Sequence, residues 1–141
     1  MLGALPAGFF GIRVGRRMSI LFGFALLAAC LAALDRVTQI GQAMPLLLLA
    51  SAAWTFPTVN AYPLFVEPVP PSLRGVLASL YLLCMGLGGA VGDPLNGMLF
   101  DLLGGYGPLF LVMATYAVLA LLAVMMIPPG TGEAEAGDSS A

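Results

Sequence analysis

The feature that most constrains this chain is a series of long apolar runs separated by short segments rich in charge, glycine or proline. A bilayer core about 30 Å thick is crossed by roughly 20 helical residues, and there every backbone N–H and C=O must be paired within the segment. The runs therefore predict transmembrane helices over residues 18–37, 44–66, 76–102 and 108–127. The run over 44–66 contains no charged residue.

Composition excludes a soluble globule. Of the 141 residues 60% are hydrophobic and only 9% are charged, which leaves too little polar surface to cover a folded chain of this size. We therefore expect an all-α integral membrane protein whose surroundings are the lipid bilayer. Nucleic-acid binding is excluded as well, because the few basic residues form no face that could neutralise phosphates.

The sequence lacks the combinations of residues that form an enzyme active site or a metal site. It has no histidine, no pair of acids at metal-ligand spacing, no glycine-rich phosphate loop and no nucleophile beside a base. We expect no enzymatic activity, no metal and no other cofactor. Cys30 and Cys84 lie in apolar runs, where a thiol is usually a small buried hydrophobe, so we expect no disulfide.

A short basic loop is predicted over residues 11–17, and its sequence fits the pattern G-x-x-x-D-R-x-G-R-R. Ile12 stands where that pattern has aspartate. The fixed positions are met by Gly8, Arg13, Gly15, Arg16 and Arg17. The stretch resembles the loop motif of the major facilitator superfamily, whose members have two six-helix halves.

The resemblance places this loop between helices eight and nine. The chain would then be part of the C-terminal six-helix half, with residues 1–10 as the end of a truncated helix. We expect it to need the N-terminal half or another copy as a partner. A start inside a helix suggests a truncated gene, a misplaced start or a split subunit.

Two further stretches resemble proton-coupled disaccharide symporters of the sucrose and glycoside type. They are residues 60–75 and residues 92–97, where Asp93 stands in place of a proline. The resemblance implies a secondary transporter, coupled to protons or another cation, for a small polar solute such as a sugar. Two alternatives stay open: a small four-helix exporter working as a dimer, and a non-transporting membrane subunit or relic that binds a partner.

The arginines predict the orientation, because positive residues in short loops stay on the cytoplasmic side. Arg13, Arg16 and Arg17 mark the loop over 11–17 as cytoplasmic, and Arg74 marks the loop over 67–75. The acidic tail over 128–141, which we expect to be disordered, would then also be cytoplasmic. The cell (inner) membrane is the expected location.

Charges at these two loops predict a cytoplasmic gate. One of Arg13, Arg16 and Arg17 is expected to pair with Glu67 at the end of its helix, with Arg74 nearby, and the pair would break when the helix ends separate. The alternative is that the arginines only anchor the orientation of the helices.

Three residues are candidates for the path of solute or protons. Asp93 is a charge inside an apolar run, which makes it a functional candidate; the alternatives are a carboxylate facing an outer vestibule or one capping a helix restarted by Pro94. Trp54 could stack on a sugar ring while Asn60 binds a hydroxyl. Alternatively, Trp54 only packs and Asn60 bonds to a neighbouring helix.

Helix packing is predicted at Gly88 and Gly92. These glycines form a G-x-x-x-G motif, which lets two helix backbones approach closely.

Overall fold

The computed structural model describes residues 4–104 and 106–127. These residues form five helices and no strand: α1 (Ala4–Val14), α2 (Arg16–Leu34), α3 (Ile40–Val66), α4 (Pro71–Leu103) and α5 (Tyr106–Met125). Helices α2 to α5 each contain a stretch long and apolar enough to cross a membrane. The predicted all-α membrane fold with four spans and a short N-terminal helix is confirmed. The predicted disordered tail over 128–141 lies outside the described residues.

The helices extend further into the predicted loops than the sequence suggested. Because α1 ends at Val14 and α2 begins at Arg16, the loop predicted over 11–17 narrows to Gly15. Gly15 has a φ of 94°, a conformation that a residue without a Cβ adopts readily. The loop predicted over 67–75 narrows to residues 67–70, because Pro71 starts α4, a position where its missing N–H costs nothing.

Prolines inside the helices do not interrupt them. Helix α3 runs through Pro45, Pro57 and Pro63, and α4 runs through Pro94 as one helix of 33 residues. The suggestion that Asp93 caps a helix restarted at Pro94 is therefore wrong. Membrane helices tolerate such prolines when neighbouring groups repack around the freed carbonyls.

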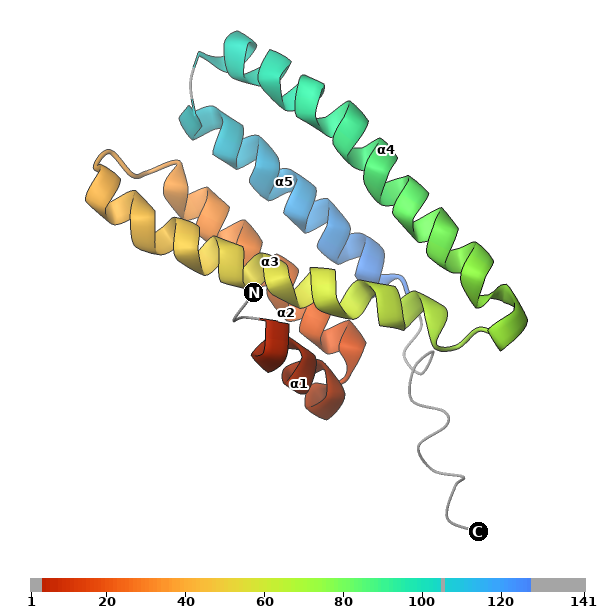
Figure 1. The fold of residues 1–141 in the computed structure, drawn as a ribbon. Helices are drawn as coiled ribbons and strands as arrows, with labels where there is room; N and C mark the ends of the chain where they lie inside the picture. Colours follow the sequence, from red (N-terminus) through yellow and green to blue (C-terminus); the bar gives the residue numbers. More distant parts are fainter. Residues whose placement is uncertain (1–3, 105, 128–141) are drawn as a thin grey trace.

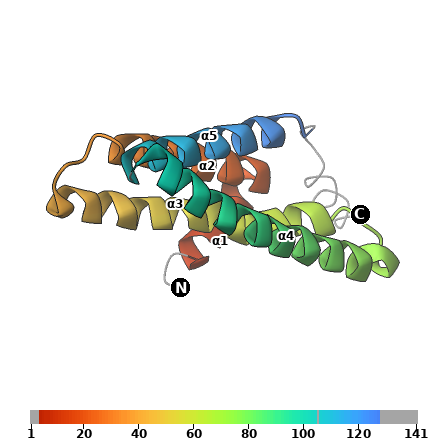
Figure 2. The ribbon, with the colours of Figure 1, turned by 90° about the horizontal axis from the view of Figure 1, so that it is seen from above.

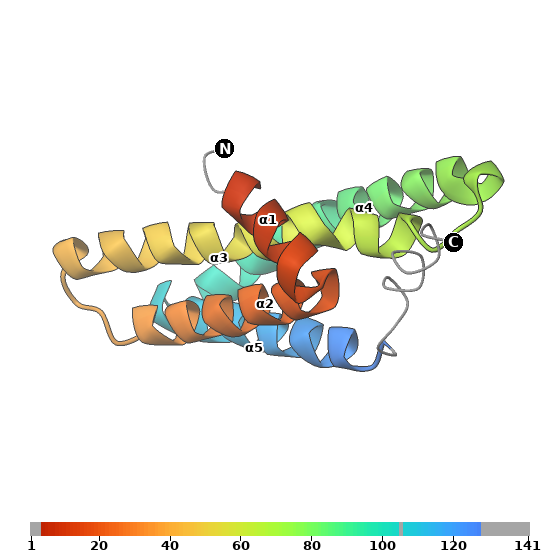
Figure 3. The same cartoon turned by 90° about the horizontal axis from the view of Figure 1, so that it is seen from below.

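Helix α2 is the centre of the packing and lies lengthwise against α3 and α5 (Figure 1). The short α1 crosses the face formed by α2 and α3 (Figure 3). Helix α4 runs diagonally at the edge of the molecule, where it contacts α3 and α5 only sparsely (Figure 2). It contains no buried residue, whereas α2 buries Ile20, Cys30 and Leu34.

Candidate functional site

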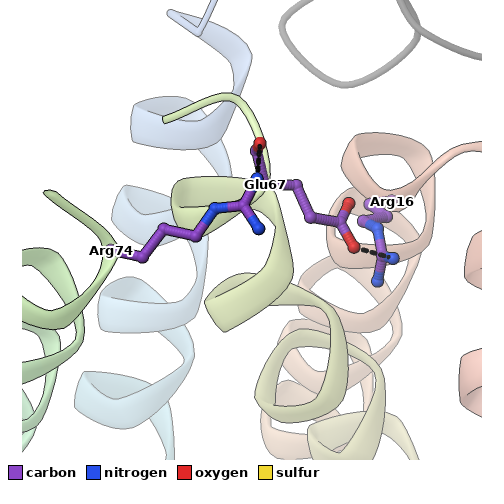
Figure 4. A network of polar contacts seen from close by, with 3 residues as sticks. All are labelled: Arg16, Glu67 and Arg74. Carbon is purple, nitrogen blue, oxygen red and sulfur yellow. Dashed lines mark hydrogen bonds and ion pairs between the residues drawn. The ribbon is translucent and has the colours of Figure 1, made fainter. Parts of the chain in front are cut away.

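The start of α2 and the end of α3 are joined by an ion pair between Arg16 Nη2 and Glu67 Oε1 (Figure 4). Of the three arginines expected to pair with Glu67, the structure selects Arg16. The exposed fractions of the two side chains are 29% and 49%. Because water reaches both partners, such a pair stabilises the contact by at most about 1 kcal/mol.

Arg74 binds the same glutamate from the other side, through the main chain. Its Nη2 donates to the carbonyl of Glu67 at 3.5 Å (Figure 4). Its Nε donates to the carbonyl of Val69 at 2.9 Å. Carbonyls at a helix end have no partner within the helix, and a guanidinium satisfies them well. Glu67 thus links α2 through its carboxylate and the start of α4 through its backbone.

Arg17 holds the end of α5. Its Nη2 donates to the carbonyl of Met125 at 2.9 Å and its Nε to that of Val124 at 3.4 Å. A cation in this position also interacts favourably with the negative end of the helix dipole. Arg13 is exposed at the end of α1, and the described residues offer it no hydrogen bond or ion pair. Four of the five basic residues therefore lie at one end of the molecule; Arg36, after α2, is at the other.

Asn60 joins three helices at a fully buried position, with an exposed fraction of 0%. Its Nδ2 lies 3.2 Å from the carbonyl of Ala7 in α1, 3.1 Å from Ser19 Oγ in α2 and 2.9 Å from the carbonyl of Phe56 in its own helix. This is the helix-bonding alternative of the sequence analysis. Ser19 was missed there, although a hydroxyl inside an apolar run is a signal that a polar partner faces it.

Gly11 faces the other side of the same amide. A Cβ at Gly11 would lie 2.0 Å from Asn60 Oδ1, an oxygen that is buried and has no hydrogen-bond partner among the described residues. Only a residue without a side chain lets α1 approach α3 this closely. The three rings of Phe10, Phe22 and Phe56 also pack together, with centroids 5.5 to 5.8 Å apart.

Gly23 makes the corresponding close contact between α2 and α3. A Cβ there would lie 2.6 Å from Pro57 Cδ and 2.9 Å from the carbonyl oxygen of Ala53. Pro57 has no N–H, so the carbonyl four residues before it, that of Ala53, lacks its usual helical donor. Gly23 lets the backbone of α2 cover this carbonyl.

The glycines predicted to pack do not do so within the described chain. Beyond the adjacent backbone of α4 itself, no atom of residues 4–104 and 106–127 lies within 4 Å of the Cβ positions of Gly88 and Gly92, because α4 stands at the edge of the molecule. Close glycine packing occurs instead at Gly11 and Gly23. A G-x-x-x-G spacing indicates that a helix can be approached closely, but it does not say which helix approaches it.

The three candidates for a solute or proton path are not brought together. Trp54 is 49% exposed, and its ring centroid lies 6.4 Å from that of Phe24. Asn60 is buried among helices, and Asp93 is exposed on α4. Among residues 4–104 and 106–127, no group of three or more His, Cys, Asp and Glu side chains could hold a metal ion.

Comparison with protein-family models matches residues 1–140 to the family described as Major Facilitator Superfamily. Neither the curated proteins nor the solved structures give a match.

Proposed function

The chain belongs to the Major Facilitator Superfamily, a family of integral membrane transporters, and from this premise we propose that it serves proton- or cation-coupled transport of a small polar solute such as a sugar. Support for the solute class comes from residues 60–75 and 92–97, which resemble disaccharide symporters. In this proposal the four spans supply part of the wall of a carrier whose other helices lie outside the described residues.

The observation that carries the proposed mechanism is the ion pair between Arg16 and Glu67. It joins the ends of two spans, so it must break or become solvated if these ends separate during alternating access. We propose that it is a cytoplasmic latch. A pair worth at most about 1 kcal/mol changes the ratio of the two states by up to about fivefold, which leaves the carrier able to switch.

The placement of the latch on the cytoplasmic side rests on charge. Arg13, Arg16, Arg17 and Arg74 gather at one end, where Glu67 is the acid among the described residues. The opposite end has Asp35, Arg36 and Asp101. An excess of arginine in short loops is retained in the cytoplasm. Where the family's motif has an aspartate, this chain has Ile12. The arginine-rich segment over 11–17 therefore has no carboxylate of its own to join Glu67.

Asp93 is the proposed proton-path residue, and Trp54 the proposed contact for the solute. Both side chains are exposed in the described chain, so they are open to water or to further helices. Asn60 has a different proposed role, because its amide is occupied by helix contacts. It would hold the helices in register instead of binding solute.

Transport measurements test this function. Membrane vesicles from cells that carry the gene in its natural context would be compared with vesicles from a deletion strain, with a panel of labelled sugars and other polar solutes. We expect uptake of at least one sugar that requires the gene and collapses when the proton or cation gradient is removed. Equal uptake by both kinds of vesicle, or uptake that ignores both gradients, would show the proposal to be wrong. Asp93→Asn vesicles that kept the full pH dependence would remove Asp93 from the proton path.

A further inference from the structure

Helix α3 carries a row of hydroxyl side chains along one face. Ser51, Thr55, Thr58 and Tyr62 follow one another at spacings of four, three and four residues. At about 100° per residue, their directions around the helix fall within about 60° of each other, and at 1.5 Å per residue the row is about 16 Å long. Ser51 and Tyr62 are exposed, and the two threonines are partly exposed. We call these four residues the hydroxyl stripe.

The hydroxyl stripe is turned away from the packed side of α3. Ala53, Pro57 and Asn60 are buried against α1 and α2. Their mean direction lies about 160° around the helix from that of the stripe. Tyr62 meets Tyr81 of α4, with ring centroids 5.6 Å apart. At this end the stripe therefore lies on the side of α3 that borders α4.

Few other polar side chains occur on this helix. Between residues 43 and 66, the remaining side chains that can form hydrogen bonds are those of Trp54 and Asn60. Asn60 is buried among helices, and Trp54 is 49% exposed. A helix with lipid all around it gains nothing from collecting its hydroxyls on one face, whereas such a face suits a helix that borders water or a polar molecule.

The hydroxyl protons at the centre of the stripe are already used. Thr55 Oγ1 donates to the carbonyl of Ser51 at 3.1 Å. Thr58 Oγ1 donates to the carbonyl of Trp54 at 2.7 Å and lies 3.1 Å from that of Thr55. Because a hydroxyl has one donor and two acceptor lone pairs, both threonines present acceptors to their surroundings. A molecule that binds here without breaking these bonds has to donate hydrogen bonds itself.

We propose that the hydroxyl stripe binds a neutral polyhydroxylated solute, whose own hydroxyl groups donate to Thr55 and Thr58. The inference rests on the transport function proposed above, because a solute has to pass α3, and it adds a selection by charge. Carboxylates and phosphates bring further acceptors to these lone pairs, so they are rejected. No cation offsets this, because all five basic residues are arginines at helix ends.

The fluorescence of Trp54 measures binding directly. It is the only tryptophan of the chain and lies one helical turn before Thr58. The protein in lipid vesicles would be titrated with the neutral probes glucose, sorbitol and sucrose, and with the acids glucuronate and gluconate. We expect at least one neutral probe to change the emission saturably, and both acids to bind at least about tenfold more weakly than that probe.

Substitutions in the stripe identify the binding groups. Thr55→Val and Thr58→Val remove a hydroxyl at nearly the same shape, so each should weaken binding of the neutral probe about twofold to tenfold, as expected for a lost hydrogen bond. Thr115→Val on α5 is the matched control, because the hydroxyl of Thr115 also donates to its own helix, to the carbonyl of Val112 at 2.6 Å. It should bind the probe like the unchanged protein.

The proposal would be overturned if no neutral probe bound saturably, if the acids bound as tightly, or if the variants at residues 55 and 58 bound like Thr115→Val. Variants that lowered the free energy of unfolding and left binding unchanged would assign the stripe to a contact with another helix. Uptake separates this inference from the transport function. Gene-dependent sugar uptake with an unchanged KM in Thr55→Val and Thr58→Val would contradict the stripe alone. Binding that depends on both threonines, without any gene-dependent uptake, would contradict transport alone.

Discussion

Replacement of Gly11 by alanine should separate α1 from α3. The new Cβ would lie 2.0 Å from Oδ1, 2.8 Å from Cγ and 3.3 Å from Nδ2 of Asn60. Asn60 has no free space to enter, because it is fully buried and its amide nitrogen is held by groups of three helices. Either the amide rotates and loses its bonds to α1 and α2, or α1 moves away.

The two responses have similar costs. Loss of two hydrogen bonds between membrane helices costs about 0.6 kcal/mol each, or about 1.2 kcal/mol in total. Displacement of a packed helix by an added methyl group typically costs about 1–3 kcal/mol. The chain takes the cheaper response, so the clash should cost about 1–2 kcal/mol. The higher helix propensity of alanine offsets up to about 1 kcal/mol of this.

Gly8→Ala is the matched control for the helix-propensity effect. Gly8 lies on the same helix and also faces α3, but a Cβ there would meet only Val59 Cγ1, at an ordinary 3.9 Å. Both variants would be unfolded by SDS titration in lipid–detergent micelles, with helix content followed by circular dichroism. The difference between their free energies of unfolding gives the cost of the clash, and we expect Gly11→Ala to be less stable by about 1–2 kcal/mol.

A double-mutant cycle decides whether Asn60 is the cause. In an Asn60→Ala background the obstructing amide is gone, so Gly11→Ala should cost nothing beyond what Gly8→Ala shows. If Gly11→Ala destabilised both backgrounds equally, the reasoning from this contact would be refuted. Equal stability of Gly11→Ala and Gly8→Ala in the unmodified protein would refute it as well.

Three further substitutions probe the other contacts. Gly23→Ala should lower the free energy of unfolding by about 2–3 kcal/mol in the same titration, which is more than Gly11→Ala does. The reason is that the new Cβ would meet a proline ring and a backbone carbonyl that cannot move aside. A smaller loss than that of Gly11→Ala would contradict this. Arg17→Gln should destabilise the end of α5 by about 0.5–1 kcal/mol and speed hydrogen exchange there. Arg13→Gln is the control and should leave the exchange of α5 unchanged. Identical exchange in both variants would argue against the capping of α5 by Arg17. Glu67→Gln should shift the ratio of inward- to outward-facing states, measured from spin-label distances, by up to about fivefold, and an unchanged ratio would rule out the latch.

Sequence reasoning predicted the spans well and the contacts between them unevenly. The span over 44–66 became α3, because apolar length is a local property that decides whether a segment can enter the bilayer. The pairing of Glu67 with one arginine followed from the order of the helices, since both groups had to reach the same end. The loop over 11–17 was predicted too long, because Gly15 alone supplies the turn.

The role of Asn60 and the glycine contacts could not be read from the chain. In a membrane helix both faces are apolar, so periodicity does not say which face meets a neighbour. Gly88 and Gly92 have the spacing of a packing motif and meet open space in the described chain, whereas Gly23, which has no glycine four residues before or after it, makes one of the closest contacts.

The sequence by itself therefore determined that this chain enters a membrane, how many described spans it has, at which end its arginines lie and to which family it is similar. These properties depend on hydropathy, length and charge order, which act along the chain. Only the tertiary structure decided that Arg16, and not Arg13 or Arg17, pairs with Glu67, that Asn60 ties α1 to α2 and α3, and that α4 stands unburied at the edge. Such choices depend on shape and hydrogen-bond fit between helices, because burial in lipid gives one apolar face no advantage over another.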